Sequence, residues 1–226
     1  MREVMVQYLQ HRLLKWFDEN HRIFPWREDQ ATKYQQIVSE ILLQRTKAET
    51  VAKYYDTFFS KFPDWNALAN ASLEELEEIM KPLGLYRHRA RRLYKLGEDI
   101  RKRGGRIPGD KNELRDSGFI GLYVTNAFEL FILKNRKPLL DVNMSRLLKR
   151  YFKPGDFIDV RHDKEIQELA NDIIEVRRCK ELNWAILDYA ALVCKVRNPL
   201  CGECVLNKYC RYYELSQGEV AEKPER

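Results

Sequence analysis

Four of the five cysteines of this chain lie in one short run near its carboxyl terminus, C-K-V-R-N-P-L-C-G-E-C-V-L-N-K-Y-C. Six, two and five residues separate Cys194, Cys201, Cys204 and Cys210. Thiolates placed this closely can converge on one metal centre, and all-cysteine ligation leaves a structural zinc ion or a 4Fe–4S cluster as the main candidates. Disulfides are a weaker alternative, because nothing else marks the chain as secreted and cytosolic thiols stay reduced. Cys179 lies outside the run, and we expect it to be a small buried residue.

Length and charge limit the class of protein. A chain of 226 residues forms one large domain or two small ones, and it buries a core without disulfides. The net charge of +6 and the pI near 9.0 favour a polyanionic partner, nucleic acid first. No apolar run reaches the length of a membrane span, and Met1–Glu19 carries charges throughout, without a signal-peptide core. We therefore expect a cytoplasmic protein, nucleoid-associated if DNA is the partner, that acts as a monomer without a membrane partner.

Helical periodicity recurs along the chain, whereas the period-two alternation of strands is not sustained anywhere. Ser72 and Glu75 form a capping-box signature that begins one helix, which runs to Pro82. The polar tail after Gly218 is expected to be disordered. The sequence therefore predicts an all-α fold, with further helices over 3–18, 34–45, 48–61, 86–103, 110–116, 122–133, 143–152, 163–177 and 182–194.

A glycine-containing turn separates two of these predicted helices. It reads Ser-Gly-Phe-Ile-Gly over 117–121 and contains Gly118 and Gly121. A tight glycine turn at a helix N-terminus points backbone N–H groups outward, where a phosphate can accept them. An ordinary helix–helix connection is the alternative interpretation.

Asp141 follows Pro138-Leu139-Leu140 and precedes a predicted helix, within L-L-D-V-N-M-S-R. One interpretation is a helix cap or a salt bridge with Arg146. The other is catalytic. A carboxylate can stabilise positive charge that develops on a substrate, or it can orient an attacking water molecule.

The cysteine spacing, the glycine turn and D-x-N-x-x-R together resemble the helix-hairpin-helix DNA glycosylase superfamily, which includes endonuclease III and the adenine glycosylase MutY. The resemblance covers roughly residues 20–212. It implies a 4Fe–4S cluster on the four cysteines, DNA phosphate binding at Gly118 and Gly121, and Asp141 as the catalytic carboxylate. The turn departs from the usual L-P-G-V-G of family hairpins, since the proline is missing and Phe119 replaces the first glycine.

Tyr123 stands two residues after Gly121, where bifunctional members of the family carry a lysine. A lysine there forms a Schiff base with the sugar and cuts the strand, whereas tyrosine cannot. The resemblance therefore implies base removal without efficient strand cleavage. The alternative for Tyr123 is simple packing, in which case a buried hydroxyl still needs a partner.

Two further stretches, Phe-Pro-Trp-Arg at 24–27 and I-V-S-E-I-L-L-Q-R-T at 37–46, resemble MutY and the thymine-mismatch glycosylases. The glutamate that matches Glu40 protonates the leaving base in the adenine enzymes, and a solvated carboxylate is the alternative. Gln44 and Arg45 would enter the duplex after base flipping. Arginine at 45 and the short segment 84–93 resemble the thymine-mismatch enzymes more than MutY.

Nine basic residues lie close together in the sequence, between residues 87 and 106. A solvated surface is an equally good interpretation of this cluster, which comprises Arg87, Arg89, Arg91, Arg92, Lys95, Arg101, Lys102, Arg103 and Arg106. Lys195 and Arg197 are better candidates for phosphate contact. They lie inside the first cysteine gap, and a loop fixed by two cluster ligands presents its cations with little entropy loss.

The resemblance implies two helical lobes with the active-site cleft between them, Tyr123 and Asp141 facing each other across it. A six-helix barrel lobe with the helix-hairpin-helix spans 23–135. A cluster lobe combines 1–22 with 136–212, and 213–226 is a polar tail. The expected function is a monofunctional glycosylase acting on thymine or uracil mispaired with guanine in double-stranded DNA. The alternatives are an adenine glycosylase without the C-terminal domain by which MutY recognises 8-oxoguanine, and a non-catalytic DNA-binding module.

Overall fold

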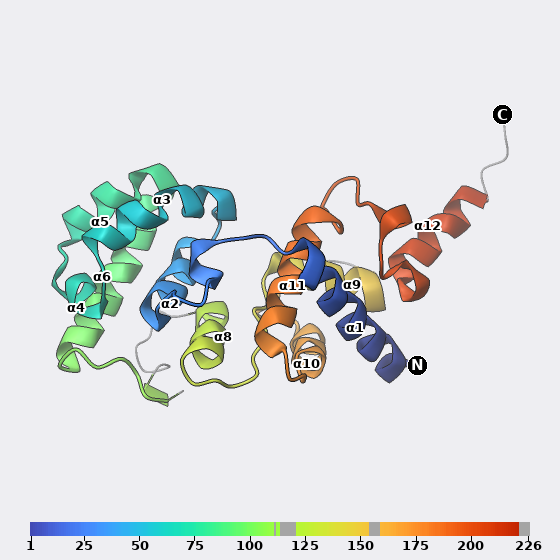
Figure 1. Ribbon diagram of the computed structural model, residues 1–226, viewed down its shortest axis with the longest axis horizontal. Helices are drawn as coiled ribbons and strands as arrows, with labels where there is room; N and C mark the ends of the chain where they lie inside the picture. Colours follow the sequence, from blue (N-terminus) through green and yellow to red (C-terminus); the bar gives the residue numbers. More distant parts are fainter. Residues whose placement is uncertain (111, 114–120, 154–158, 222–226) are drawn as a thin grey trace. The chain divides into compact units, whose positions relative to one another are not determined.

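The computed structural model describes residues 1–110, 112–113, 121–153 and 159–221, and the regular elements within these ranges are all helical (Figure 1). The predicted all-α class is confirmed. The chain divides into two compact units, one formed by Met1–Arg22 with Arg136–Arg226 and the other by Ile23–Asn135. Each unit has a core of its own.

In the unit Ile23–Asn135, helices α4 and α5 pack on α6, and α2 packs on α8. The apolar residues of α6 recur at helical spacing, so that Leu93, Leu96 and Ile100 are buried on one face. The elements of this unit are the 3₁₀ turns Pro25–Arg27 and Lys81–Leu83 and the helices α2 (Lys33–Leu42), α3 (Ala48–Lys61), α4 (Trp65–Asn70), α5 (Leu73–Met80), α6 (Tyr86–Lys102) and α8 (Leu122–Phe131).

Reciprocal capping boxes start two helices of this unit. Ser72 Oγ accepts from Glu75 N at 3.1 Å and Glu75 Oε2 accepts from Ser72 N at 3.0 Å, so the predicted capping box of α5 is confirmed. Thr32 and Gln35 form the same reciprocal pair at the start of α2. Both pairs satisfy backbone N–H groups that have no partner within the helix.

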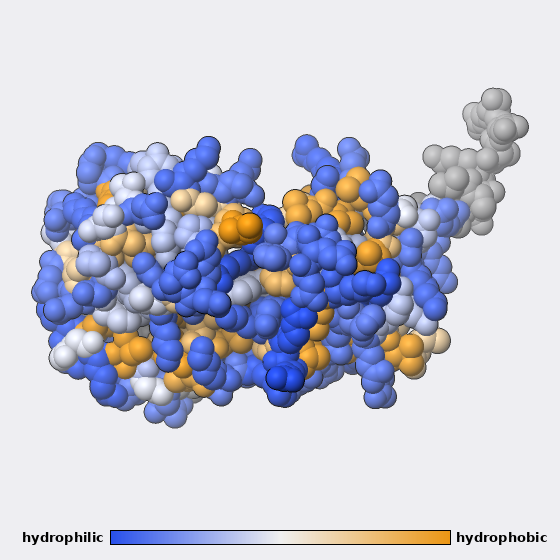
Figure 2. Space-filling model, viewed as in Figure 1, coloured by the Kyte–Doolittle hydropathy of each residue, from blue (hydrophilic) through white to orange (hydrophobic). Residues whose placement is uncertain are grey.

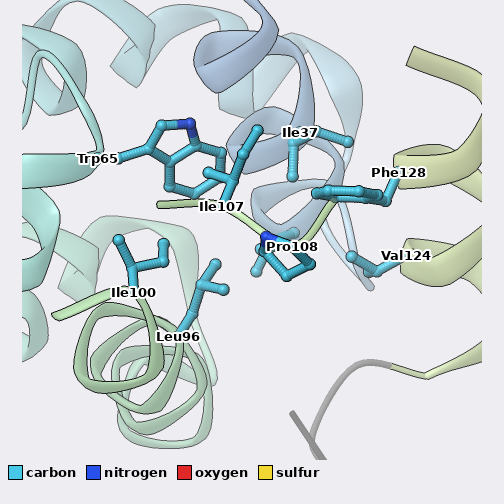
Figure 3. A pocket seen from close by; sticks show the side chains of 9 residues that line it. Ile37, Trp65, Leu96, Ile100, Ile107, Pro108, Val124 and Phe128 are labelled. Atoms are coloured by element: carbon cyan, nitrogen blue, oxygen red, sulfur yellow. The ribbon is translucent and has the colours of Figure 1, made fainter. Parts of the chain in front are cut away.

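A small pocket lies in the core of this unit, next to α2, α6 and α8 (Figure 3). Its lining side chains are apolar or aromatic, so it is a feature of core packing and brings together no titratable groups. They are Ile37, Ile41, Trp65, Leu96, Ile100, Ile107, Pro108, Val124 and Phe128.

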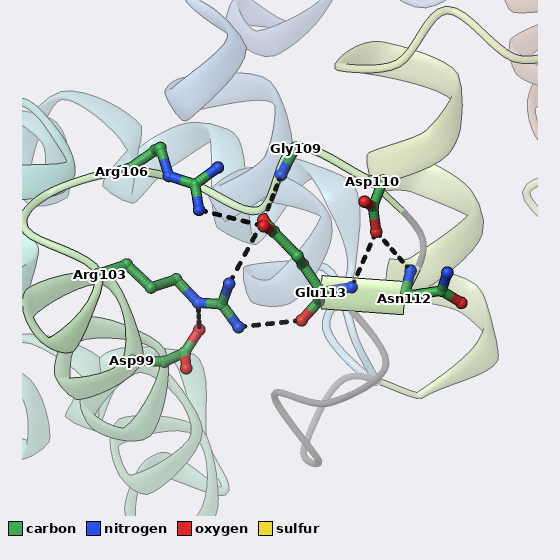
Figure 4. A network of polar contacts seen from close by, with 7 residues as sticks. All are labelled: Asp99, Arg103, Arg106, Gly109, Asp110, Asn112 and Glu113. Carbon is green, nitrogen blue, oxygen red and sulfur yellow. Dashed lines mark hydrogen bonds and ion pairs between the residues drawn. The ribbon is translucent and has the colours of Figure 1, made fainter.

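The segment after α6 is tied down by a polar network around Glu113 (Figure 4). The Glu113 carboxylate accepts from Gly109 N at 2.8 Å and from Arg106 at 3.0 Å. Arg103 donates to Asp99 at 2.8 Å and to the Glu113 carbonyl at 3.1 Å. Two arginines of the predicted basic cluster are therefore paired with carboxylates. Of the predicted helix 110–116, residues 112–113 are helical and the turn residues 117–120, with Gly118, lie outside the described residues.

In the other unit, α1 packs on α11, and α9 packs on α10, α11 and α12. The Asp188 carboxylate is fully buried and accepts from Arg22 Nε at 2.8 Å and from Arg22 N at 3.0 Å, which fixes the chain just beyond α1. The elements are α1 (Arg2–Asn20), α9 (Val142–Phe152), α10 (Lys164–Ile173), α11 (Cys179–Leu192), the 3₁₀ turns Cys201–Glu203 and Asn207–Tyr209, and α12 (Arg211–Ala221).

Two helices lie outside the predicted set. Helix α4 is too short to show a period, and Asp64 starts it by accepting from Ala67 N at 2.8 Å. Helix α12 corrects the expectation of disorder directly after Gly218, because the chain is helical through Ala221. This helix begins directly after Cys210, whose carbonyl accepts from Glu214 N at 3.0 Å.

Helix boundaries also differ from the prediction. Helix α2 ends at Leu42 instead of residue 45, because Arg45 adopts a left-handed conformation with φ of 58°. Helix α10 ends at Ile173 instead of 177, and α11 begins at Cys179 instead of 182.

The surface is mostly hydrophilic on the face drawn in Figure 2, with small hydrophobic groups between charged side chains. Within the described ranges, every helix is too short or too polar to pass through a lipid bilayer. This is consistent with the polar composition of the sequence.

Gly97 allows α6 and α4 to approach closely, and replacing it tests this packing. A Cβ on Gly97 would lie 2.7 Å from the Leu68 carbonyl oxygen and 3.1 Å from Ala69 Cα. We expect Gly97→Ala to lower the free energy of unfolding by about 1–3 kcal/mol, because overpacking outweighs the gain in helix propensity. Thermal unfolding followed by circular dichroism measures the change.

Gly202→Ala is the matched control, since a Cβ on Gly202 meets no atom within 4 Å. Its melting temperature should stay close to that of the parent protein. A Gly97→Ala variant that melts at or above the parent temperature would contradict the close approach of α4 and α6.

Candidate active site and cluster-binding loop

The four cysteines of the run lie in the loop between α11 and α12, and all four are half-buried. Arg150 Nη1 lies 3.6 Å from Cys194 Sγ, and the Tyr189 hydroxyl donates to Cys204 Sγ at 3.2 Å. Cys210 Sγ lies 3.6 Å from the Arg150 carbonyl oxygen. Residues of α9 and α11 thus contact the loop at three of its four cysteine sulfur atoms.

The thiols act on one another electrostatically. Burial raises the pKa of Cys201, Cys204 and Cys210, that of Cys210 to about 11, and the charge of Cys194 adds to the rise in each case. Among the described residues, no three His, Cys, Asp or Glu side chains are placed to hold a single metal ion. A four-iron cluster spreads its thiolate ligands more widely than one zinc ion does, so the donor set fits a cluster better.

Asp141 caps α9. Its carboxylate accepts from Asn143 N and Met144 N at 2.8 Å each and from Asn143 Nδ2 at 2.6 Å. Burial raises the pKa of Asp141 above its ordinary value of 3.8, and these three donors together with the charge of Arg146 oppose the rise. The capping interpretation therefore describes the geometry correctly.

The segment before Asp141 is held by a buried residue that the sequence did not single out. Asn183 of α11 accepts from Leu139 N at 2.6 Å and donates to the Lys137 carbonyl at 3.1 Å. It is fully buried. A polar residue within the apolar face of the predicted helix 182–194 was the signal that could have identified it.

Glu40 and Tyr123 form a pair within the unit Ile23–Asn135. The Tyr123 hydroxyl donates to Glu40 Oε2 at 2.7 Å, and Glu40 is only 3% exposed. The interpretation of Glu40 as a solvated carboxylate is therefore wrong. Helices α2 and α8, which pack on each other, carry the two side chains.

Gly121 is the N-cap of α8 and is exposed. Its φ of −73° is open to any residue, and a Cβ there would meet no atom within 4 Å. The fold itself does not require glycine at this position.

The loop between α2 and α3 presents Arg45 to solvent and is held from behind. Arg89, only 4% exposed, donates to the Gln44 carbonyl and, at 3.0 Å, to the Leu83 carbonyl. Arg92 donates to the Gln44 side-chain oxygen. Two members of the predicted basic cluster therefore support the loop, which the spacing of basic residues did not indicate.

Lys195 and Arg197 are exposed in the loop between Cys194 and Cys201. Arg150 fixes the backbone beside them by donating to the Lys195 carbonyl at 2.6 Å and to the Val196 carbonyl at 3.1 Å. Cys179 is buried as predicted, and burial raises its pKa to about 11.

Comparison with known proteins identifies close relatives. A thymine-DNA glycosylase of Aeropyrum pernix is 34% identical over 213 residues, which cover 92% of this chain and 95% of that protein. A thymine/uracil-DNA glycosylase of Methanothermobacter thermautotrophicus is 31% identical, covering 89% of this chain and 91% of that protein. The solved structure of a thermostable thymine-DNA glycosylase superposes with a TM-score of 0.85 at 29% identity, covering 94% of this chain and 98% of that one.

Two family models match complementary parts of the chain. Residues 194–210 match the iron–sulfur binding domain of endonuclease III, so the group bound by the four cysteines is a 4Fe–4S cluster and the predicted cofactor is confirmed. Residues 38–176 match the HhH-GPD superfamily of base excision DNA repair proteins, and DNA is the macromolecular partner. This second match spans more than half of the chain, which therefore belongs to the HhH-GPD superfamily of base excision DNA repair proteins.

Proposed function

We propose that this protein is a monofunctional DNA glycosylase that hydrolyses the N-glycosidic bond of thymine or uracil mispaired with guanine. The observation that carries the proposal is the Gln44–Arg45 loop. Arg89 and Arg92 both donate to Gln44, and the next residue, the exposed Arg45, has a left-handed backbone conformation. The similarity to thymine and thymine/uracil glycosylases over about nine-tenths of the chain supports it.

Arg45 is the proposed reader of the orphaned guanine. Guanine presents two acceptors, O6 and N7, and the planar guanidinium donates to such a pair in a bidentate manner. A mispaired pyrimidine costs less to flip than a matched one, so the mismatch itself supplies part of the selectivity.

Asp141 is the proposed catalytic carboxylate. As the N-glycosidic bond breaks, positive charge develops on the sugar, and an ionised Asp141 stabilises it or orients the attacking water. Three N–H donors hold the carboxylate in one orientation before the substrate arrives.

Glu40 and Tyr123 are proposed to act together on the base being removed. Glu40 would donate a proton to the base, and the hydrogen bond from Tyr123 would fix the orientation of the Glu40 carboxyl group. Tyrosine has no amine with which to form a Schiff base, so the enzyme removes the base without efficient strand cleavage. Gly121, Lys195 and Arg197 are proposed to contact DNA phosphates. The fold does not require glycine at 121, and the absence of a side chain there leaves room for a phosphate group. Gly118 stays a prediction from the sequence.

The 4Fe–4S cluster would be held by Cys194, Cys201, Cys204 and Cys210. When bound, it cross-links the loop that carries Lys195 and Arg197, which keeps the two cations ordered. The protein's own residues carry out the hydrolysis.

The substrate assignment is tested with a panel of duplexes containing one mismatched or damaged base each. We expect faster single-turnover excision of thymine or uracil opposite guanine than of any other base, with strand breaks appearing mainly after alkali. Faster excision of adenine opposite guanine or 8-oxoguanine would replace this proposal with the adenine glycosylase. If no base is excised from any duplex, the remaining interpretation is a non-catalytic DNA-binding module.

The role of Asp141 is tested by Asp141→Asn, which should keep DNA affinity and lower the excision rate on the order of 10²–10³-fold. The parent enzyme should also lose activity as the pH falls. The ionised fraction of Asp141 decreases as the pH falls through a pKa that burial raises above 3.8, so the decline begins at a higher pH than for an exposed aspartate. Single-turnover rates measured against pH provide both results.

Asp163→Asn is the matched control, since Asp163 caps α10 by accepting from Ile166 N at 3.1 Å and lies in the same unit. Its excision rate should stay near that of the parent. Normal single-turnover excision by Asp141→Asn would remove Asp141 from the mechanism.

The role of Arg45 is tested by Arg45→Gln. This variant should lose preference for guanine opposite the target by about 10-fold or more, the range of one bidentate base contact, with a smaller loss of overall affinity. Arg91→Gln removes the same charge from an exposed position on α6 and should keep the preference. If both variants change the preference equally, Arg45 contributes only charge.

A further inference from the structure

The Tyr189 hydroxyl contacts the sulfur of one of the four cysteines in the cluster-binding loop, between α11 and α12. The side chain belongs to α11 and is 1% exposed. Its hydroxyl lies 3.2 Å from Cys204 Sγ. Trp16 of α1 packs edge-on against the ring, with 4.9 Å between the ring centroids. The ring therefore has little freedom to turn the hydroxyl away.

The second contact of the hydroxyl settles the direction of the hydrogen bond. Val205 N donates to the Tyr189 oxygen at 2.8 Å, which occupies one acceptor site of that oxygen. A cysteine that ligates iron is a thiolate and has no proton to donate. The phenol proton consequently points at Cys204 Sγ, and the sulfur is the acceptor.

The backbone of Tyr189 also contacts the loop. Its carbonyl accepts from Cys194 N at 2.9 Å, so one residue touches two of the four ligands. Arg150 also brings a side-chain donor near a ligand sulfur, since its Nη1 lies 3.6 Å from Cys194 Sγ. The Tyr189 hydroxyl makes the shorter of the two contacts.

We propose that Tyr189 sets the reduction potential of the 4Fe–4S cluster through the hydrogen bond from its hydroxyl to Cys204 Sγ. Donation to a ligand sulfur stabilises the more negative, reduced state of a cluster more than its oxidised state. The hydrogen bond therefore raises the potential. Tyr189 is a positioning and tuning residue, and the inference does not depend on which base the enzyme removes.

The test is a pair of substitutions that change the hydrogen bond in opposite directions. Tyr189→Phe removes the donor and should shift the potential to a more negative value. Replacement of Tyr189 by 3,5-difluorotyrosine makes the phenol a stronger donor and should shift the potential to a more positive value. Potentials are measured on the full-length protein with its cluster by voltammetry, free and bound to an undamaged duplex.

Tyr151→Phe is the matched control, because Tyr151 is a buried tyrosine of the same unit whose hydroxyl donates to the Met5 carbonyl at 3.2 Å and not to sulfur. It should leave the potential unchanged. A Tyr189→Phe protein that keeps its cluster and the parent potential would overturn the proposal. If Tyr189→Phe loses its cluster, the fluorinated protein decides: a potential equal to that of the parent would overturn the proposal, and a positive shift would support it.

Discussion

Two arginines one turn apart on α9 connect the cluster-binding loop to the helix that Asp141 caps. Arg146 donates to the Cys194 and Ala190 carbonyls at 3.0 and 2.8 Å, and Arg150 donates to the Lys195 and Val196 carbonyls. These carbonyls end α11 and begin the loop, where helical partners run out. Because Arg146 also donates to the Asn143 side chain at 3.1 Å, the same contacts order the residues around Asp141. The cluster-binding loop and the Asp141 carboxylate are thus both held by contacts with α9.

Buried polar residues fix the positions of the proposed functional groups. Asn183 holds the chain before Asp141, Tyr123 holds Glu40, and Arg89 holds the Gln44 carbonyl. Each of them meets its partner across a long sequence separation, within the interior of one unit. A buried polar group that is fully hydrogen-bonded has few alternative orientations, so each pair pre-organises the groups of its own unit before DNA binds.

The positive charge of the protein is divided between arginines that make contacts within the fold and cations that are exposed on loops. Arg89 and Arg92 bind the Gln44 loop, while Arg103 and Arg106 bind carboxylates on their own segment. Arg45, Lys195 and Arg197 are exposed on loops. A run of basic residues in a sequence therefore overstates the charge that is available to a phosphate, because part of it satisfies the fold.

The sequence by itself determined the all-α class and four metal-binding cysteines, because helical periodicity, caps such as Ser72 and cysteine spacing are local signals. The motifs together indicated the family, and the resemblance to that family indicated the 4Fe–4S cluster. It could not determine that α2 ends before Arg45, that α12 follows Cys210, or that Glu40 is buried. Only the tertiary structure decided these features and the partners of Arg89, Asn183 and Tyr189. Their contacts join residues far apart in the chain, such as Glu40 with Tyr123, and no local pattern encodes which distant side chain will satisfy a buried polar group.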